Sequence, residues 1–207
     1  MTTLPWTLDA TADQAQGRRS RRRQQPRAPR RSVIERLDAG EITEEEAVDL
    51  AREAVLRTLT AAPKSRRELE QSLARKGYPD QVAGQVLDRL AKVGLINDAD
   101  YADLIVRTRH SERGLSRRAI AVELRRRGID ADQAAAALDQ IDDNSERQAA
   151  RALAEKLVTK NRHCDKDVQV RRAVSALARR GYSPSLAYDA VKQALETQEM
   201  PEWDGAG

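Results

Sequence analysis

Several residue types on which large cores and covalent scaffolds depend are scarce in this chain of 207 residues. Phenylalanine is absent, aromatic residues make up 3% of the sequence, and Cys164 is the single cysteine. The chain therefore cannot form an internal disulfide, which fits a reducing cytoplasm. Apolar residues reach 40% and charged residues 34%. This balance is typical of thin helical units with narrow stripes of Leu, Val, Ile and Ala, and it argues against one large core.

Long hydrophobic segments are missing as well. No apolar run approaches the roughly 18–20 residues of a membrane-spanning helix. The first residues also lack the apolar stretch of a signal peptide. We therefore expect a cytoplasmic protein that does not associate with a membrane.

Residue sets for enzymatic chemistry are equally sparse. The two histidines, His110 and His163, are far apart in the sequence, and His163 with Cys164 lacks the second pair of ligands that a zinc site requires. Neighbouring residues rarely point at one another, so Cys164 is a poor candidate for a nucleophile activated by His163. There is no glycine-rich phosphate loop. These observations predict a protein that is not an enzyme and that uses no cofactor or metal.

The net charge of +4 hides an uneven distribution. Residues 1–32 carry eight Arg against two Asp, and residues 107–127 carry eight Arg against two Glu, so each segment has a net charge of +6. A local basic face of this kind binds an anionic polymer whatever the total charge. Residues 128–155 instead hold seven acidic residues against two Arg. A solvated turn, with a metal site as the lesser alternative, explains the acidic residues Asp139, Asp142, Asp143 and Glu146.

Both ends of the chain differ from its middle. Residues 1–31 combine Thr, Gln, Arg and Pro with almost no periodic apolar pattern, so we expect a disordered basic tail there. A tail of this composition most often acts as a solvated electrostatic arm. Residues 198–207 are expected to form a second disordered tail.

An internal repeat organises the rest of the chain. Its three copies are SRRELEQSLARKGY (65–78), SRRAIAVELRRRGI (116–129) and VRRAVSALARRGY (170–182). The glycines Gly77, Gly128 and Gly181 lie 51 and 53 residues apart, each four residues after a leucine and directly after two basic residues. A period near 50 residues is the signature of stacked units that are each too small to bury a full core alone.

Helix signals divide each unit into three helices. Thr43 with Glu46 and Ser65 with Glu68 form capping boxes, and Asn97 or Asp98 starts the second unit. A short helix within 32–42, ending near Gly40, precedes the helices 43–59, 66–76, 80–92, 99–111, 117–127, 131–141, 146–160, 167–180 and 184–196. The sequence therefore predicts an all-α fold, an elongated array of three three-helix repeats over residues 32–94, 95–143 and 144–197.

The basic clusters of the repeat are the candidate contact residues. Cations in the last turn of a helix complement its dipole, but this explains only one or two per helix. Arg118 and Arg125 share one helix face, opposite the buried stripe of Ile120 and Leu124. Phosphate or an acidic partner is therefore favoured as the ligand of the candidates Arg107, Arg109, Arg113, Arg117, Arg118, Arg125, Arg126, Arg127, Arg75, Lys76, Arg179 and Arg180.

The residue after each repeat glycine has two possible roles. Tyr78 and Tyr182 could stack on nucleic-acid bases. Ile129 takes the same place in the middle unit, which indicates a position that requires bulk. Packing in the core is therefore the favoured interpretation.

The middle unit also resembles a known family. GLINDADYADLIVRTR (94–109) and RGLSRRAIAVELRRRGID (113–130) look like the signature of the RecX regulatory proteins, which modulate the RecA recombinase. SRRELEQSLARKGY and LARRGYSPSLAYDAVKQAL match the first and third repeats of that family. The resemblance covers residues 44–196 and leaves out the basic tail.

This resemblance implies a curved array of three three-helix units that binds in the deep groove of the RecA–single-stranded DNA filament. Such a protein opposes filament extension and lowers ATPase and strand-exchange activity, restraining recombination and the SOS response. The implied partners are the RecA filament and the single-stranded DNA within it, with weak direct DNA binding. We expect the free protein to be monomeric.

Two other function classes remain open. Each triplet resembles a helix-turn-helix, so the chain could be a transcription regulator that reads a major groove. The threefold repetition and the lack of a helix with a reading set of Asn, Gln and Arg argue against this alternative. A helical protein-interaction scaffold is the other alternative, and its affinity would depend little on DNA.

Overall fold

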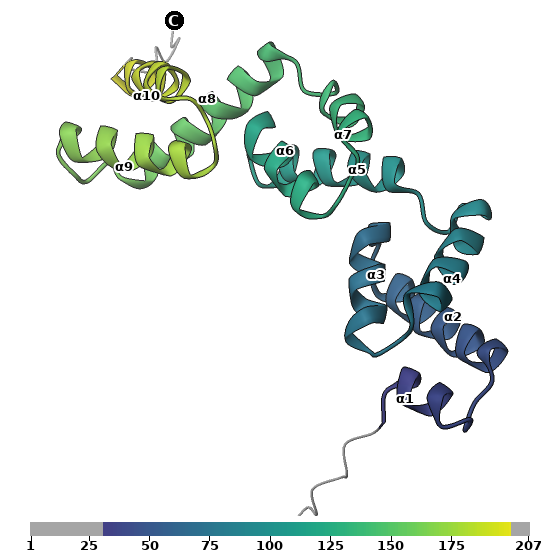
Figure 1. Cartoon of the computed structure of the whole chain (residues 1–207). Coiled ribbons are helices and arrows are strands. Elements are labelled where there is room, and N and C mark those ends of the chain that lie inside the picture. The colour runs from purple at the N-terminus through teal and green to yellow at the C-terminus, as the bar shows by residue number, and fades with distance from the viewer. Residues whose placement is uncertain (1–30, 200–207) are drawn as a thin grey trace, which may run out of the picture. The chain divides into compact units, whose positions relative to one another are not determined.

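The computed structural model describes residues 31–199, and this part of the chain contains ten α-helices, one π-helical turn and no strands (Figure 1). The all-α fold expected from the sequence is confirmed. The two tails expected at residues 1–31 and 198–207 fall almost wholly outside the described residues.

Three helical triplets follow a short first helix, α1 (Val33–Asp38). Repeat 1 consists of α2 (Glu44–Ala61), α3 (Arg66–Arg75) and α4 (Asp80–Lys92). Repeat 2 consists of α5 (Asp98–Arg107), the π-helical turn η1 (Thr108–Glu112), α6 (Arg117–Arg126) and α7 (Ala131–Leu138). Repeat 3 consists of α8 (Asp143–Lys160), α9 (Lys166–Arg179) and α10 (Pro184–Glu199).

Side-chain caps set most helix starts where the sequence places them. The capping boxes of Thr43 and Ser65 are both present, and Asn97 is the residue that caps α5. The predicted start of helix 146–160 is wrong, because the Asp142 side chain accepts the Ser145 N–H and α8 begins at Asp143. The end predicted at residue 111 is also wrong, because α5 gives way to η1 after Arg107.

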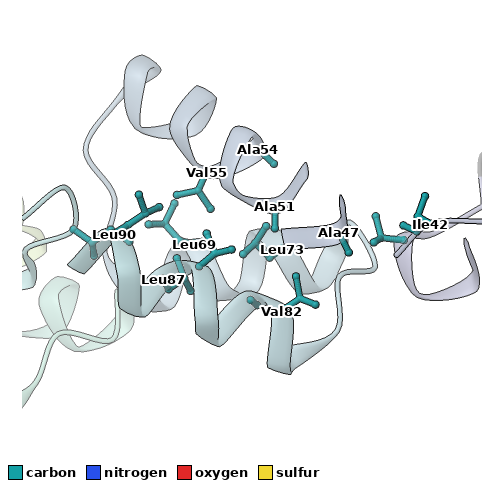
Figure 2. Close-up of a cluster of buried hydrophobic side chains, with 14 residues drawn as sticks. Ile42, Ala47, Ala51, Ala54, Val55, Leu69, Leu73, Val82, Leu87 and Leu90 are labelled. Atoms are coloured by element: carbon teal, nitrogen blue, oxygen red, sulfur yellow. The ribbon is translucent and has the colours of Figure 1, made fainter. Parts of the chain in front are cut away.

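Each repeat has its own apolar cluster. In repeat 1, Val55, Leu69, Leu73 and Leu87 meet between α2, α3 and α4 (Figure 2). The cluster of repeat 3 is rich in alanine, whose small side chain lets helices approach closely; its buried alanines are Ala150, Ala154, Ala173, Ala187, Ala190 and Ala194. None of the three clusters contains Phe, as the composition requires.

The residue after each repeat glycine packs in a core, as expected. Ile129 is 6% exposed and Tyr182 is 4% exposed, while Tyr78 is partly buried against the cluster of repeat 1. Tyr182 is therefore not free to stack on a base, while Tyr78 remains partly exposed.

Candidate protein and nucleic-acid interface

The middle helix of every repeat carries two arginines at equal distances from its glycine. They lie ten and two positions before the glycine, eight residues apart, which is about 12 Å along a helix axis. All six side chains are exposed, and they are Arg67 and Arg75 on α3, Arg118 and Arg126 on α6, and Arg171 and Arg179 on α9. We call this set the register arginines.

The register arginines are almost free of internal partners. Arg179 donates to the Ser175 hydroxyl at 2.8 Å, and the other five make no hydrogen bond or ion pair within residues 31–199. A cation that remains unpaired on the surface keeps its charge available for an anionic ligand. Reasoning from basic clusters alone missed Arg67 and Arg171, although aligning the three repeats by their glycines would have found them.

Four other candidates are also exposed. The side chains of Arg107, Arg125 and Lys76 have no hydrogen-bond or ion-pair partner in the described part of the chain. Arg113 is exposed too, and its backbone carbonyl accepts a hydrogen bond from Arg180 Nε at 3.3 Å. These residues extend the set of available cations on repeats 1 and 2.

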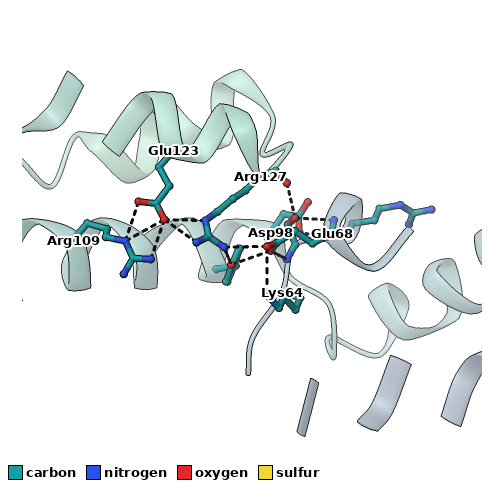
Figure 3. A network of polar contacts seen from close by, with 9 residues as sticks. Lys64, Glu68, Asp98, Arg109, Glu123 and Arg127 are labelled. Atoms are coloured by element: carbon teal, nitrogen blue, oxygen red, sulfur yellow. Dashed lines mark hydrogen bonds and ion pairs between the residues drawn. The ribbon is translucent and has the colours of Figure 1, made fainter. Parts of the chain in front are cut away.

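The remaining four candidates are bound within the protein. Arg109 is 14% exposed and holds Glu123 with two N–O distances of 2.9 Å, from Nε to Oε2 and from Nη2 to Oε1. Arg127 joins Glu123 at 2.8 Å and Glu68 at 3.1 Å, and it also donates to the hydroxyl of Tyr101 (Figure 3). Glu68 comes from repeat 1, so this network crosses from one repeat to the next.

Burial and hydrogen bonds shift the ionisation of this network. The hydrogen bond from Arg109, followed by that from Arg127, lowers the pKa of Glu123 despite burial. Burial alone would raise the pKa of Glu68, but the Ser65 N–H, the Tyr101 hydroxyl and the Arg127 charge outweigh it and lower the pKa. Burial, aided by the hydrogen bond to Glu68, raises the pKa of Tyr101 to about 12. Both carboxylates are therefore charged, and the phenol is neutral, at pH 7.

Arg117, one of the candidate contact residues, is bound to other parts of the fold. Its Nη2 lies 2.9 Å from Asp139, its Nη1 donates to the carbonyl of Ile141 at 3.3 Å, and its backbone N–H donates to Glu146 at 3.0 Å. Asp142 caps α8. Three of the four acidic residues interpreted as a solvated turn thus have structural partners.

The structure also places His163, Cys164 and the side chains that could bind a metal ion. No group of three or more His, Cys, Asp and Glu side chains among them could hold a metal ion. His163 is exposed, and the Cys164 sulfur lies 3.3 Å from Arg172 Nη1, with no hydrogen bond between His163 and Cys164 in residues 31–199. No helix in residues 31–199 combines the length and apolar character needed to span a membrane.

Family models match each repeat separately. The model of the first three-helix domain of RecX matches residues 51–90, that of the second matches residues 97–138, and that of the third matches residues 145–191. Each match lies inside one of the three triplets of the fold.

Relatives and solved structures agree with these matches. The chain is 43% identical to the regulatory protein RecX of Thermobifida fusca over 159 residues, covering 77% of this chain and 86% of that protein. It is 45% identical to RecX of Mycolicibacterium smegmatis over 152 residues, covering 72% and 81%. The crystal structure of RecX from Lactobacillus salivarius is similar in fold, with a TM-score of 0.61 and 24% identity over 74% of this chain and 97% of that chain. Matched in all three of its repeats, this chain belongs to the RecX family of regulatory proteins.

Proposed function

We propose that this protein is a negative regulator of RecA that binds in the groove of the RecA–single-stranded DNA filament. There it blocks filament extension and lowers ATPase and strand-exchange activity, restraining recombination and the SOS response. Membership of the RecX family supports the regulatory role. Occupancy of the groove is sufficient for such inhibition, so the proposal requires no catalytic group.

The register arginines are the observation on which this proposal depends most. A filament repeats the same protein and phosphate groups along its length, and a protein that binds along it benefits from charges that also repeat. Two exposed arginines recur at the same positions of α3, α6 and α9. A cationic side chain of this kind binds DNA phosphates or acidic side chains of RecA.

We assign contact roles within the candidate set on this basis. The register arginines, with Arg107, Arg113, Arg125 and Lys76, are the proposed contacts with the filament. Arg109, Arg117, Arg127 and Arg180 are proposed to support the fold, because each already bonds to an acidic side chain or a backbone carbonyl.

The direct test is the ATPase activity of RecA on single-stranded DNA with and without this protein. We expect inhibition that rises with the ratio of this protein to RecA, and faster loss of filaments that are still growing or exchanging subunits. Inhibition should persist in Cys164→Ser and His163→Ala. Unchanged ATPase and strand exchange at saturating protein would contradict the proposal and favour the helix-turn-helix transcription regulator instead.

A further inference from the structure

The repeated basic–glycine motif joins neighbouring units at three corresponding places, with different hydrogen-bonding atoms at each. The end of α3 meets the start of α1, where Ile34 N–H donates to the Gly77 carbonyl at 2.9 Å. The end of α6 meets the start of α3, where Ser65 Oγ donates to the Arg127 carbonyl at 2.6 Å. The end of α9 meets the start of α6, where Ser116 N–H donates to the Arg180 carbonyl at 3.0 Å. We call these three contacts the helix-end joints.

Each joint satisfies backbone groups that a helix end leaves unpaired. A helix ends with free carbonyls and begins with free N–H groups, and these carry partial charges of opposite sign. Each joint places the carbonyl end of one helix against the N–H end of another helix. In two of them an acidic side chain from the next repeat also accepts the first N–H of the middle helix: Asp98 from Arg66 at 2.9 Å and Glu146 from Arg117 at 3.0 Å.

The glycines are required by the closeness of these joints. All three have positive φ, and a Cβ on Gly77 would lie 2.5 Å from the Ser32 Cβ. A Cβ on Gly181 would lie 2.5 Å from the Ser116 Oγ, and one on Gly128 would collide with the Arg67 side chain. The glycine that ends each middle helix thus also permits contact with the preceding unit.

One joint has a salt-bridge network in addition to its backbone contacts. Arg127, which directly precedes Gly128, reaches Glu68 on α3 at 3.1 Å, and Tyr101 donates to the same carboxylate at 3.0 Å. The buried apolar clusters of repeats 1, 2 and 3 are separate from one another, although that of repeat 1 also includes Val33 of α1. Polar contacts therefore contribute to the join between repeats 1 and 2.

We propose that the Arg127–Glu68 pair is a positioning element that holds repeat 2 against repeat 1 and thereby fixes the spacing between the register arginines of α3 and α6. Arg127 then acts on filament binding through the placement of Arg75, Arg118 and their equivalents, and not through a contact of its own. The effect on binding rests on the proposed function, whereas the effect on spacing is a property of the free protein.

The spacing is measured first, in the free protein. In a Cys164→Ser background, spin labels are placed at the exposed positions Ala74→Cys on α3 and Ala135→Cys on α7, and the distance between them is determined by double electron–electron resonance. Glu68→Gln is the more conservative variant, because glutamine preserves the capping box with Ser65 while removing the charge. Arg127→Gln is the second variant, and circular dichroism confirms that each is folded.

We expect both variants to broaden the distance distribution, and the double variant to broaden it no further than either alone. The matched control is Arg126→Gln, which removes the neighbouring charge but no internal ion pair and should leave the distribution unchanged. An unchanged distribution in folded Glu68→Gln and Arg127→Gln would overturn the proposal.

Filament binding then separates a positioning residue from a contact. Losing a phosphate contact lowers the salt dependence of binding by about one unit. Arg126→Gln should weaken binding and reduce this slope, whereas Arg127→Gln should weaken binding several-fold with the slope unchanged. An equal loss of slope in both, or full binding by Arg127→Gln, would refute the positioning role. Failure of the wild type to bind filaments at all would count against the proposed function, while the spacing measurement would still decide whether the pair holds the repeats.

Discussion

Ser65 Oγ donates a 2.6 Å hydrogen bond to the backbone carbonyl of Arg127, 62 residues further along the chain. The serine is fully buried, and its hydroxyl also accepts the Glu68 N–H as the cap of α3. The Ser65 hydroxyl thus caps the start of α3 in repeat 1 and bonds to the backbone at the end of α6 in repeat 2. The local stability of one repeat is coupled through it to the arrangement of the next.

Because this joint is closely packed, we expect three Gly→Ala substitutions to change the free energy of unfolding by different amounts. Gly40→Ala should cost about 1–2 kcal/mol, because its positive φ strains an L-residue although the surrounding space is open. Gly128→Ala should cost clearly more, since the new Cβ also displaces Arg67. Gly84 lies inside α4 with open space around it, so Gly84→Ala should stabilise by about 0.5–1 kcal/mol. Urea denaturation measures all three, and equal losses at Gly40 and Gly128 would contradict the close contact.

Acid should weaken the salt-bridge network in a defined direction. The pKa of Glu123 is lowered in the folded state, chiefly by the hydrogen bond from Arg109. The unfolded chain therefore binds more protons between the two pKa values, and stability falls as the pH drops from the unfolded value of about 4.5 through the folded value. Free energies of unfolding between pH 7 and pH 3 should decline more steeply for the wild type than for Glu123→Gln.

The matched control for this titration is Glu112→Gln, at an exposed position with no ion pair in the described residues. Its acid response should follow that of the wild type. Parallel curves for the wild type and Glu123→Gln would show that the Arg109–Glu123 pair contributes no pH-dependent stability.

Loss of register arginines should impair binding without loss of stability. In Arg118→Gln/Arg126→Gln we expect weaker filament binding, a salt slope reduced by about two units and an unchanged melting temperature. Arg117 is left intact, because it bonds to Asp139 and Ile141 and its removal would disturb the fold. Lys160→Gln/Arg162→Gln removes the same charge from the α8–α9 connection and serves as the control. Equal binding by the two double variants would eliminate the middle register arginines as contacts.

The basic tail should affect DNA affinity more than stability. A chain that lacks residues 2–30 should keep its melting temperature, because this segment has few apolar residues to bury. It should bind free DNA more weakly at low salt, and the difference should shrink as salt is raised. Calorimetry and fluorescence anisotropy measure the two effects. A fall of more than a few degrees would mean that the segment stabilises the repeats.

Local signals in the sequence were sufficient to predict the helices, although not all of their boundaries. Ser65 and Thr43 carry their partners three residues away, so the starts of α3 and α2 could be predicted from spacing alone. The role of Arg127 could not be predicted in this way, because Glu68 lies 59 residues earlier in the chain and contacts Arg127 only in the folded protein. Eight arginines in residues 107–127 therefore looked equivalent in the sequence, although the fold pairs three of them with acidic side chains.

Helix α1 is the first element of the described residues that takes part in a helix-end joint. It is only six residues long, yet its first turn covers the end of α3, where Ile34 N–H donates to the Gly77 carbonyl. Proteins built from stacked units need a terminal element that resembles a unit on its inner side and water-compatible surface on its outer side. Ser32 and Ile34 already lie against Gly77, so another molecule would have to displace α1 to reach this end of α3. A short helix of the same chain therefore covers a helix end that would otherwise be exposed.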